Sequence, residues 1–445
     1  MQQNRPQSLT LETEVFGPIS FQGERVSSLE LAPNAKTAVR LNMTAGTRPG
    51  RAQMTCRIKG LNVNGESREM EKKWFLETRS AYPPLTRIWK TQIPPNGVFE
   101  LASADVHALV PETVNVRAGL GTEPVINLAD HVSQLFAYPY GCLEQTVSGL
   151  FPHVFLTESD FSALGLKTHS KEETETKIRL GIQRLLEKQK SSGGFGLWDG
   201  KSPESAWLTA YAAHFFTAAH DAGFEIPRSG VKKAMDRLVQ YVRRPNMIPY
   251  PGYVNRRAYR AAVRAYAAFV LARVQSLGLG DARSVFAYVD KYGSNCLGLV
   301  QAGVAQSLAG DRHTAVKAFD LAIKTQRDPE TYLGDYGSNV RDFSAAYYYL
   351  STYFPEYRYR ALFLHELDAA LADREWLSTQ ERNALVMAGA LQPKGLKLKT
   401  GARLTFILIW SWQDIPIPCL LPKALGSLCH AGSWIPRASL FRCQR

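Results

Sequence analysis

The hydrophobic pattern divides the 445 residues of this chain into a β part and an α part. From residue 8 to about residue 80, apolar and polar positions alternate, and Leu9, Leu11 and Val15 fall on one face. Such alternation is typical of strands with one buried face. Turn signals at Pro33-Asn34 and Asn64-Gly65 separate the stretches, which predicts an antiparallel β-sandwich. The expected strands cover 9–15, 28–31, 37–43, 52–58 and 68–78.

From Ile126 onwards the apolar residues recur three and four positions apart, as in Ile178, Ile182 and Leu185. This period predicts amphipathic helices. About twelve helices result, a number consistent with helix hairpins stacked in a closed ring. The expected helices cover 127–137, 142–163, 173–189, 205–222, 229–243, 257–276, 281–291, 297–309, 312–323, 339–352, 357–373 and 378–391.

These patterns predict four segments, 1–82, 83–125, 126–392 and 393–445. A linker rich in proline opens the second segment, which also holds strand candidates at 98–101 and 113–120. The last segment shows no sustained period and contains three of the eight tryptophans and three of the six cysteines. We therefore expect it to be disordered or to derive from out-of-frame sequence.

Composition and charge exclude several classes of protein. The six cysteines form no C-x-x-C pair, which argues against a zinc site, a thioredoxin-like motif or a disulfide framework. The formal net charge is +13, but residues 393–445 hold eight Lys or Arg and one acid, Asp414, so over half of the excess lies there. We therefore expect no nucleic-acid partner, and no metal or other cofactor. The chain opens without a signal peptide, and its longest apolar run, 404–412, is too short to span a bilayer.

The stretch AYPYGCLEQT, residues 137–146, carries the chemistry of the chain. Cys142 and Gln145 are three positions apart, so their side chains share one face of a helical turn. If the Gln145 amide loses ammonia to the Cys142 thiol, the product is an internal thioester, an acyl group stored for a nucleophile. We expect the start of a helix at Cys142 to favour the thiolate by lowering its pKa, which makes the sulfur a better leaving group.

The CLEQ sequence preceded by YPYG resembles the thioester motif of the α2-macroglobulin and complement family, in its bacterial form. INLAD at 126–130, GGFGLW at 193–198 and WLTAY at 207–211 extend the resemblance, which covers residues 8 to 391. The resemblance implies a macroglobulin-type β-sandwich, part of a CUB-like β-domain in 83–125, and a thioester domain folded as an (α/α)6 toroid. It also implies a peptidase inhibitor, not an enzyme, whose Cys142–Gln145 thioester captures lysine amines of attacking peptidases.

Four further side chains near the motif have suggested roles. Tyr138 and Tyr140 match aromatic positions of bacterial relatives, which favours a hydrophobic shield over the thioester. Glu144 is expected to be a first-turn acid that suits the helix dipole. His153 is a conceivable base, but no motif matches the histidine of complement-type relatives, so direct aminolysis is the simpler mechanism.

Two alternatives remain open beside the inhibitor. The first is an enzyme on an (α/α)6 ring, although the acidic D-x-D-D cluster of a terpenoid cyclase and a Cys–His peptidase signature are absent from the sequence. The second is a truncated fragment without function. Full-length relatives are anchored in the periplasm, whereas this chain, taken as written, has no anchor and would be cytoplasmic.

Overall fold

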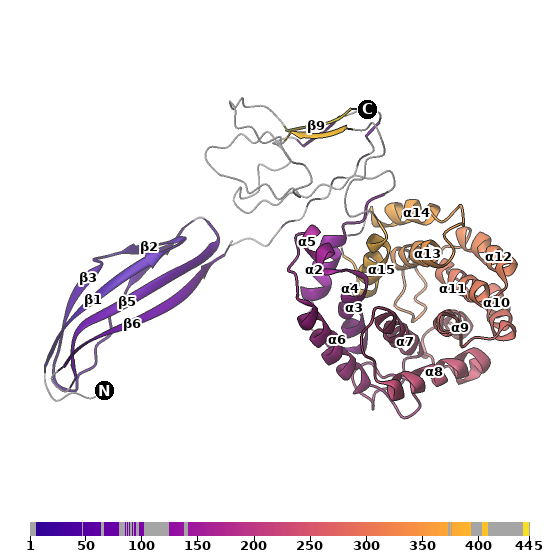
Figure 1. Cartoon of the computed structure of the whole chain (residues 1–445), viewed down its shortest axis with the longest axis horizontal. Coiled ribbons are helices and arrows are strands. Elements are labelled where there is room, and N and C mark those ends of the chain that lie inside the picture. Colours follow the sequence, from indigo (N-terminus) through magenta and orange to yellow (C-terminus); the bar gives the residue numbers. More distant parts are fainter. Residues whose placement is uncertain are drawn as a thin grey trace. The chain divides into compact units, whose positions relative to one another are not determined.

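The computed structural model describes residues 6–46, 48–63, 66–79, 98–101, 124–137, 141–372, 374, 376–392, 403–407 and 439–444, with six single positions between 85 and 94. The chain forms two compact units, which are shown in Figure 1. One contains strands from both ends of the chain, and the other is helical.

The N-terminal part of the first unit is an antiparallel β structure. Its strands are β1 (Gln7–Phe16), β2 (Ile19–Gln22), β3 (Val26–Leu31), β4 (Asn42–Ala45), β5 (Gly50–Val63) and β6 (Glu66–Thr78). The larger sheet has the order β3-β1-β5-β6, and β2 pairs with β4 in a second sheet. The alternating pattern is confirmed on β1, where Leu9, Leu11 and Thr13 are buried. Thr13 lies opposite the buried Cys56 of β5.

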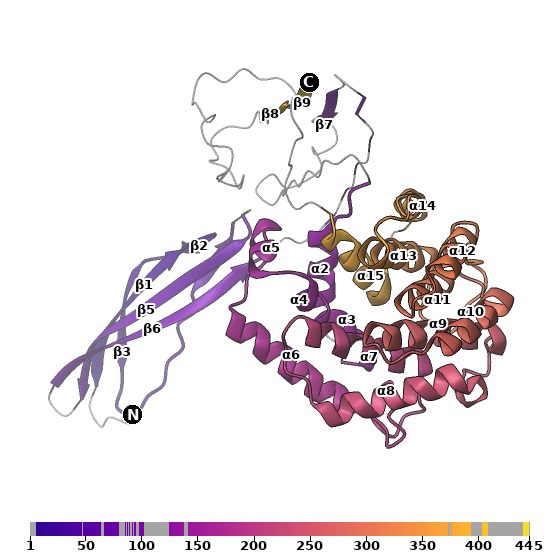
Figure 2. The same cartoon turned by 45° about the vertical axis from the view of Figure 1, so that its right-hand side comes forward.

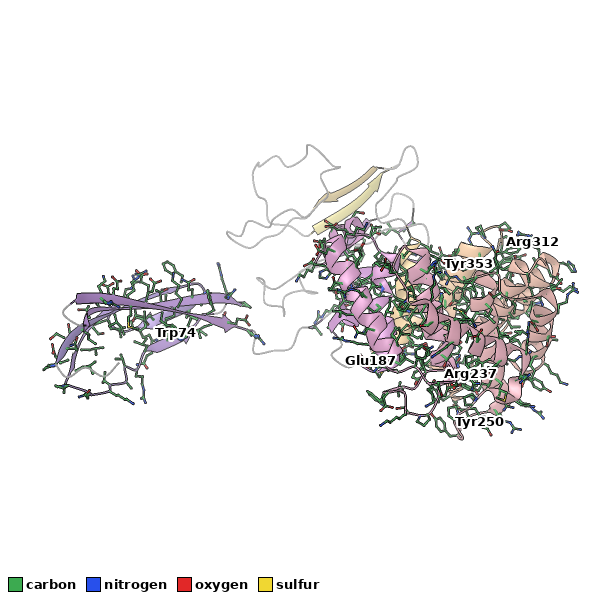
Figure 3. The ribbon with its side chains drawn as sticks, turned by 60° about the horizontal axis from the view of Figure 1, so that its bottom comes forward. Trp74, Glu187, Arg237, Tyr250, Arg312 and Tyr353 are labelled. Atoms are coloured by element: carbon green, nitrogen blue, oxygen red, sulfur yellow. The ribbon has the colours of Figure 1, made fainter. Side chains whose placement is uncertain are left out.

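The prediction for residues 37–43 was wrong over most of its length. Only Asn42 and Met43 belong to a strand, and Val39 is exposed. Residues 37–41 pair with no described strand, so their alternation buries no face. Alternation alone therefore does not establish a strand. Conversely, β6 is a strand although apolar residues such as Trp74, labelled in Figure 3, are exposed on it.

A third sheet joins strands that are far apart in the sequence. It has the order β7-β9-β8, with β7 at Val98–Leu101, β8 at Arg403–Ile407 and β9 at Ser439–Gln444. The strand expected at 98–101 is confirmed, whereas the one expected at 113–120 lies outside the described residues. The sequence did not predict β8 and β9, because strands of five or six residues give a weak signal, and because β7, which pairs with β9, lies more than three hundred positions away.

The helical unit contains two kinds of helix. Those of one kind are buried on almost every side: α7 (Ala206–Asp221), α9 (Arg256–Arg273), α11 (Cys296–Leu308), α13 (Asn339–Tyr353) and α15 (Thr379–Ala390). Those of the other kind bury a narrower stripe: α6 (Lys171–Leu186), α8 (Arg228–Arg243), α10 (Leu279–Tyr292), α12 (Arg312–Ile323) and α14 (Leu362–Leu371). The first kind lies inside the second in Figure 1, and Figure 2 shows α6 and α8 outside α7.

The inner helices contact one another in a closed succession. It runs from α3 (Leu143–Leu150) through α7, α9, α11, α13 and α15, and α15 contacts α3 again. α2 (Leu128–Ala137) packs outside α15. The neighbouring inner helices α7 and α9 meet near their N-termini, where the Trp207 backbone N–H of α7 donates to the Tyr259 hydroxyl oxygen of α9. The alanines of α9 are buried, which permits close helix approach.

The helix predictions were confirmed except at two places. The helix expected at 142–163 is three helices, namely α3, α4 (Pro152–Phe155) and α5 (Glu158–Ala163). Pro152 opens α4 because its ring fits the first helical position, and Thr157 caps α5 after the extended Leu156. The helix expected from 357 begins only at Leu362. None of the described helices combines the length and apolarity needed to cross a bilayer.

Candidate functional site

Cys142 is the N-cap of α3, the first helix of the inner succession. The other five inner helices are capped by Ser205, Asn255, Asn295, Ser338 and Ser378, and each of these side chains accepts a backbone N–H. The Cys142 sulfur forms no capping hydrogen bond of that kind, although the backbone N–H groups of Gln145 and Glu144 lie near enough to lower its pKa. Sulfur is a weak acceptor, so a cysteine at this position gives up the stabilisation that an oxygen would provide. A cysteine at a position where the other inner helices have an oxygen-bearing cap is therefore a candidate for a reactive residue.

The spacing of Cys142 and Gln145 is that of a capping box. In such a box the third helical residue turns its side chain back to the N-cap residue. Three boxes in this protein show the geometry: the side-chain oxygens of Asp160, Glu173 and Glu381 lie 2.8, 2.8 and 2.6 Å from the N-cap nitrogens of Thr157, Ser170 and Ser378. Cys142 and Gln145 occupy the corresponding positions in α3. A thioester between them would be a capping box closed by a covalent bond.

Burial decides the acidity of the Cys142 thiol. The side chain is buried, and burial raises its pKa above the ordinary value, as does the charge of Glu144. The backbone N–H groups of Gln145 and Glu144, together with the charge of Lys188, lower it by less. The expected depression of the pKa was therefore wrong, because loss of water outweighs the helix terminus. A dry sulfur suits storage of an acyl group, since water is the competing nucleophile.

The Gln145 side-chain carbonyl oxygen is buried and accepts no hydrogen bond from the described residues. In a thioester this oxygen would be the acyl carbonyl oxygen. Donors aimed at such an oxygen stabilise the charge that develops during attack. An acyl group without these donors reacts slowly, which again fits storage.

Glu144 is buried within the motif and bound by two hydroxyl groups. Ser148 donates to Oε1 at 2.8 Å, and Thr379 of α15 donates to Oε2 at 2.6 Å. Burial raises the pKa of Glu144, against the opposing effect of both hydroxyls. Ser148 also contacts the Tyr211 hydroxyl, to which Asn383 donates. Glu144 is thus in the first turn, as expected, but it joins α3 to α15 and α7 instead of facing solvent, which the sequence did not reveal.

The GGFGLW segment holds the start of α3 in place. The Leu143 N–H donates to the Leu197 carbonyl at 2.8 Å, and Lys188 binds the Trp198 carbonyl at 2.9 Å. Gly193 has a φ of 87°, and a Cβ at this position would lie 2.1 Å from the Lys233 carbonyl oxygen. The segment thus forms a tight glycine turn, and Trp207, Leu208 and Tyr211 are buried on the helix that follows, α7.

The remaining suggested residues have mixed outcomes. Tyr138 and Tyr140 lie outside the described residues, so their shielding role stays a prediction. Phe136, just before them in the chain, is 39% exposed and stacks on His153 with ring centroids 4.9 Å apart. His153 also lies beside Phe161 and His169, and its pKa is lowered to about 4, mainly by burial. A neutral ring in this aromatic stack fits a structural role.

Comparisons with known proteins relate this site to one family. The model of the A-macroglobulin TED domain matches residues 116–331. The α2-macroglobulin of Escherichia coli K12 is 34% identical over 390 residues, which make up 86% of this chain and 23% of that protein. This chain thus spans about a quarter of the length of that relative.

Solved structures of bacterial α2-macroglobulins resemble the chain. Native E. coli α2-macroglobulin from domain MG7 to the C-terminus matches with a TM-score of 0.76 and 32% identity, over 87% of this chain and 61% of that one. Salmonella α2-macroglobulin reacted with methylamine matches with a TM-score of 0.74 and 29% identity, over 92% and 26%. Trypsin-activated E. coli α2-macroglobulin matches with a TM-score of 0.56 and 32% identity, over 87% and 26%.

Proposed function

Since this chain is an α2-macroglobulin-like protein that spans the region around the family's thioester domain, we propose that Cys142 and Gln145 form an internal thioester that captures peptidases. The observation that carries the proposal is their placement at the N-cap and third position of α3, the spacing of a capping box. The relative that was reacted with methylamine supports a group that an amine attacks, and the relative that was activated by trypsin supports a peptidase as the partner.

The domain assignment follows the same resemblance. The closed succession of six inner helices supports an (α/α)6 toroid for residues 126–392. The antiparallel sheets of residues 1–82 are proposed to be a macroglobulin-type β-sandwich, which the match to the structure beginning at domain MG7 supports. Residues 83–125 are proposed to begin a CUB-like β-domain. The cell envelope is the proposed location.

The proposed capture step transfers one acyl group. The uncharged ε-amine of a peptidase lysine attacks the carbonyl carbon that Gln145 contributed. The carbon–sulfur bond breaks, an amide forms, and the Cys142 thiolate leaves and takes up the proton that the amine loses. Each molecule reacts once, so the chain is a single-use trap and not an enzyme. Tyr138 and Tyr140 are proposed to keep water from the bond before capture.

Mass measurement tests the proposal directly. The freshly folded chain should be lighter than its sequence mass by about 17 Da, the ammonia lost when the activated cysteine is acylated. Methylamine should add to Gln145 and release one thiol at Cys142, both located by peptide mapping. Cys142→Ser should show neither change. A chain of full mass with a freely alkylated Cys142 would refute the proposal and favour a fragment that carries the motif without its chemistry.

A further inference from the structure

The loop Asp335–Tyr336–Gly337, which precedes α13, holds an aromatic ring in an unusual backbone conformation. Tyr336 has a φ of 53°, in the left-handed region that large side chains rarely adopt. Residues in such conformations persist only where the surroundings impose them, and they cluster at functional sites. The ring is partly buried and packs against the main core of the helical unit.

A buried ion cluster imposes this conformation from the side of Asp335. Arg327 donates to both Asp335 carboxylate oxygens at 2.9 and 2.6 Å, and Arg341 donates to Oδ2 at 2.8 Å and to the Asp335 carbonyl at 3.0 Å. Asp342 accepts from both arginines, and all four residues are at most 5% exposed. The residue before Tyr336 therefore cannot shift without breaking a buried charge network.

Gly337 fixes the loop from the other side. A Cβ at this position would lie 2.2 Å from an Arg341 nitrogen and 2.3 Å from an Arg327 nitrogen. The next residue, Ser338, caps α13 and donates to Glu381 of α15 at 2.6 Å. Tyr336 thus lies between Asp335, which the ion cluster binds, and Gly337, which has no room for a side chain.

The first turn of α15 connects this loop to the thioester motif. Glu381 binds Ser338, and Thr379, two residues earlier, binds Glu144 between the proposed thioester residues. The N-termini of α3, α15 and α13 are therefore adjacent. The charges of Glu144 and Cys142 both act on the Tyr336 phenol, whose pKa is raised mainly by burial.

We propose that Tyr336 is a positioning residue whose ring closes the Cys142–Gln145 site on the side of α13 and keeps water from the acyl group. This inference rests on the proposed function, since the acyl group it protects is the thioester. The left-handed backbone and the buried ion cluster fix the direction in which the ring leaves the loop, which a relaxed loop would not ensure. Nothing in the sequence motif indicates this residue, because it lies about two hundred positions from Cys142.

Three variants separate the ring from the loop that carries it. Tyr336→Gly removes the ring while its backbone adopts the same φ without strain, so the loop should fold. Tyr336→Phe keeps the ring and removes only the hydroxyl. Tyr359→Ala removes an exposed tyrosine between α13 and α14 and serves as the control. Melting temperatures confirm that each variant folds.

The measurement is spontaneous release of the Cys142 thiol at neutral pH, followed by peptide mapping. Tyr336→Gly should speed the release about tenfold or more, whereas Tyr336→Phe and Tyr359→Ala should stay within about twofold of the parent. A parent-like rate for Tyr336→Gly overturns the inference. So does a Tyr336→Phe rate as high as that of Tyr336→Gly, because the ring alone would then not exclude water.

A second experiment tests whether Tyr336 covers Cys142 in a chain that has not formed a thioester. If the parent chain has full mass and a free thiol, the proposed function fails, yet Tyr336 can still cover the sulfur. Iodoacetamide should then alkylate Cys142 about tenfold faster in Tyr336→Gly than in the parent chain. Equal alkylation rates would overturn the covering role, whatever the state of the thioester.

Discussion

The Thr379 hydroxyl donates a 2.6 Å hydrogen bond to Glu144, although 235 positions separate the two residues. Glu144 lies in the first turn of α3, and Thr379 is the first residue of α15. The bond joins the first inner helix to the last, so it closes the succession of inner helices at the motif itself. One contact thus contributes both to the stability of the helical unit and to the geometry of the site.

Thr379→Val should destabilise the helical unit. Valine fills the same volume but donates no hydrogen bond, which leaves the buried Glu144 carboxyl with Ser148 alone. Loss of one partner from a buried polar group costs roughly 1–3 kcal/mol. Urea unfolding followed by circular dichroism at 222 nm measures the change. Thr168→Val, at an exposed position, is the control and should have little effect. Equal midpoints for the two variants would show that the contact is unimportant.

Gly193→Ala should also destabilise the chain and loosen the start of α3. Alanine at a φ of 87° is strained by roughly 1–3 kcal/mol, and its Cβ would meet the Lys233 backbone at 2.1 Å. Because this turn positions the Leu197 carbonyl that binds Leu143, Cys142 should become more reactive toward thiol reagents. Melting temperature and Cys142 alkylation are measured together.

Gly252→Ala is the matched control for the glycine substitution. A Cβ at Gly252 meets nothing within 4 Å, so this variant should melt like the parent. If Gly193→Ala also melted like the parent, the turn would have to tolerate a backbone shift, and the role of the GGFGLW segment in holding α3 would be refuted.

Local patterns were enough to predict most elements of the fold. Apolar residues spaced like Ile178, Ile182 and Leu185 predict a helix because burying one stripe requires a period near 3.6. The same reasoning missed the break at Pro152, since an apolar stripe can continue across two helices. It also missed β8 and β9, which pair with each other, while the second partner of β9 is β7, far away in the sequence.

The site was predictable only where its chemistry is local. Cys142 and Gln145 are three positions apart, so a motif reveals them. Thr379 begins α15 and Tyr336 lies in the loop before α13, both far from the motif in the sequence. Only the closed succession of inner helices brings the N-termini of α15 and α13 next to that of α3. The pKa of Cys142 was mispredicted for a related reason. The helix terminus can be seen in the sequence, whereas burial of the sulfur depends on tertiary packing.

Asp335→Asn should weaken the helical unit most at neutral pH. Burial alone would raise the Asp335 pKa, but Arg341 and Arg327 outweigh it and lower the pKa to about 2. A depressed carboxyl pKa stabilises the folded state above the unfolded value near 3.8, and this stabilisation is lost as the pH falls toward 2. Above pH 4 the substitution should cost roughly 3–5 kcal/mol, as expected for a broken buried ion pair.

Unfolding free energies of the parent and of Asp335→Asn between pH 2 and pH 5 test this dependence. The difference should be constant above about pH 4 and shrink below it, because the parent itself loses the ionised carboxyl. Asp290→Asn, at an exposed position, should track the parent throughout. A difference that does not change with pH would mean that Asp335 is not held ionised by its arginines.

His153 should make the fold sensitive to mildly acidic pH, in a window above that of Asp335. Its pKa is lowered to about 4 by burial and, to a smaller extent, by the charges of Lys177 and His169. The folded state therefore prefers the neutral ring. Its stabilisation is complete above the unfolded pKa of 6.5 and is lost as the pH falls to about 4, which amounts to at most about 3 kcal/mol. His153→Phe keeps the stack on Phe136 and should reduce the slope of the stability curve between pH 6.5 and pH 4, as measured by urea unfolding. The buried His214, whose pKa burial also lowers, keeps part of that slope. The exposed His220→Phe should leave the curve unchanged. If the acid slope of His153→Phe equalled that of the parent, burial would not hold the His153 ring neutral, and an acid–base role for His153 would have to be reconsidered.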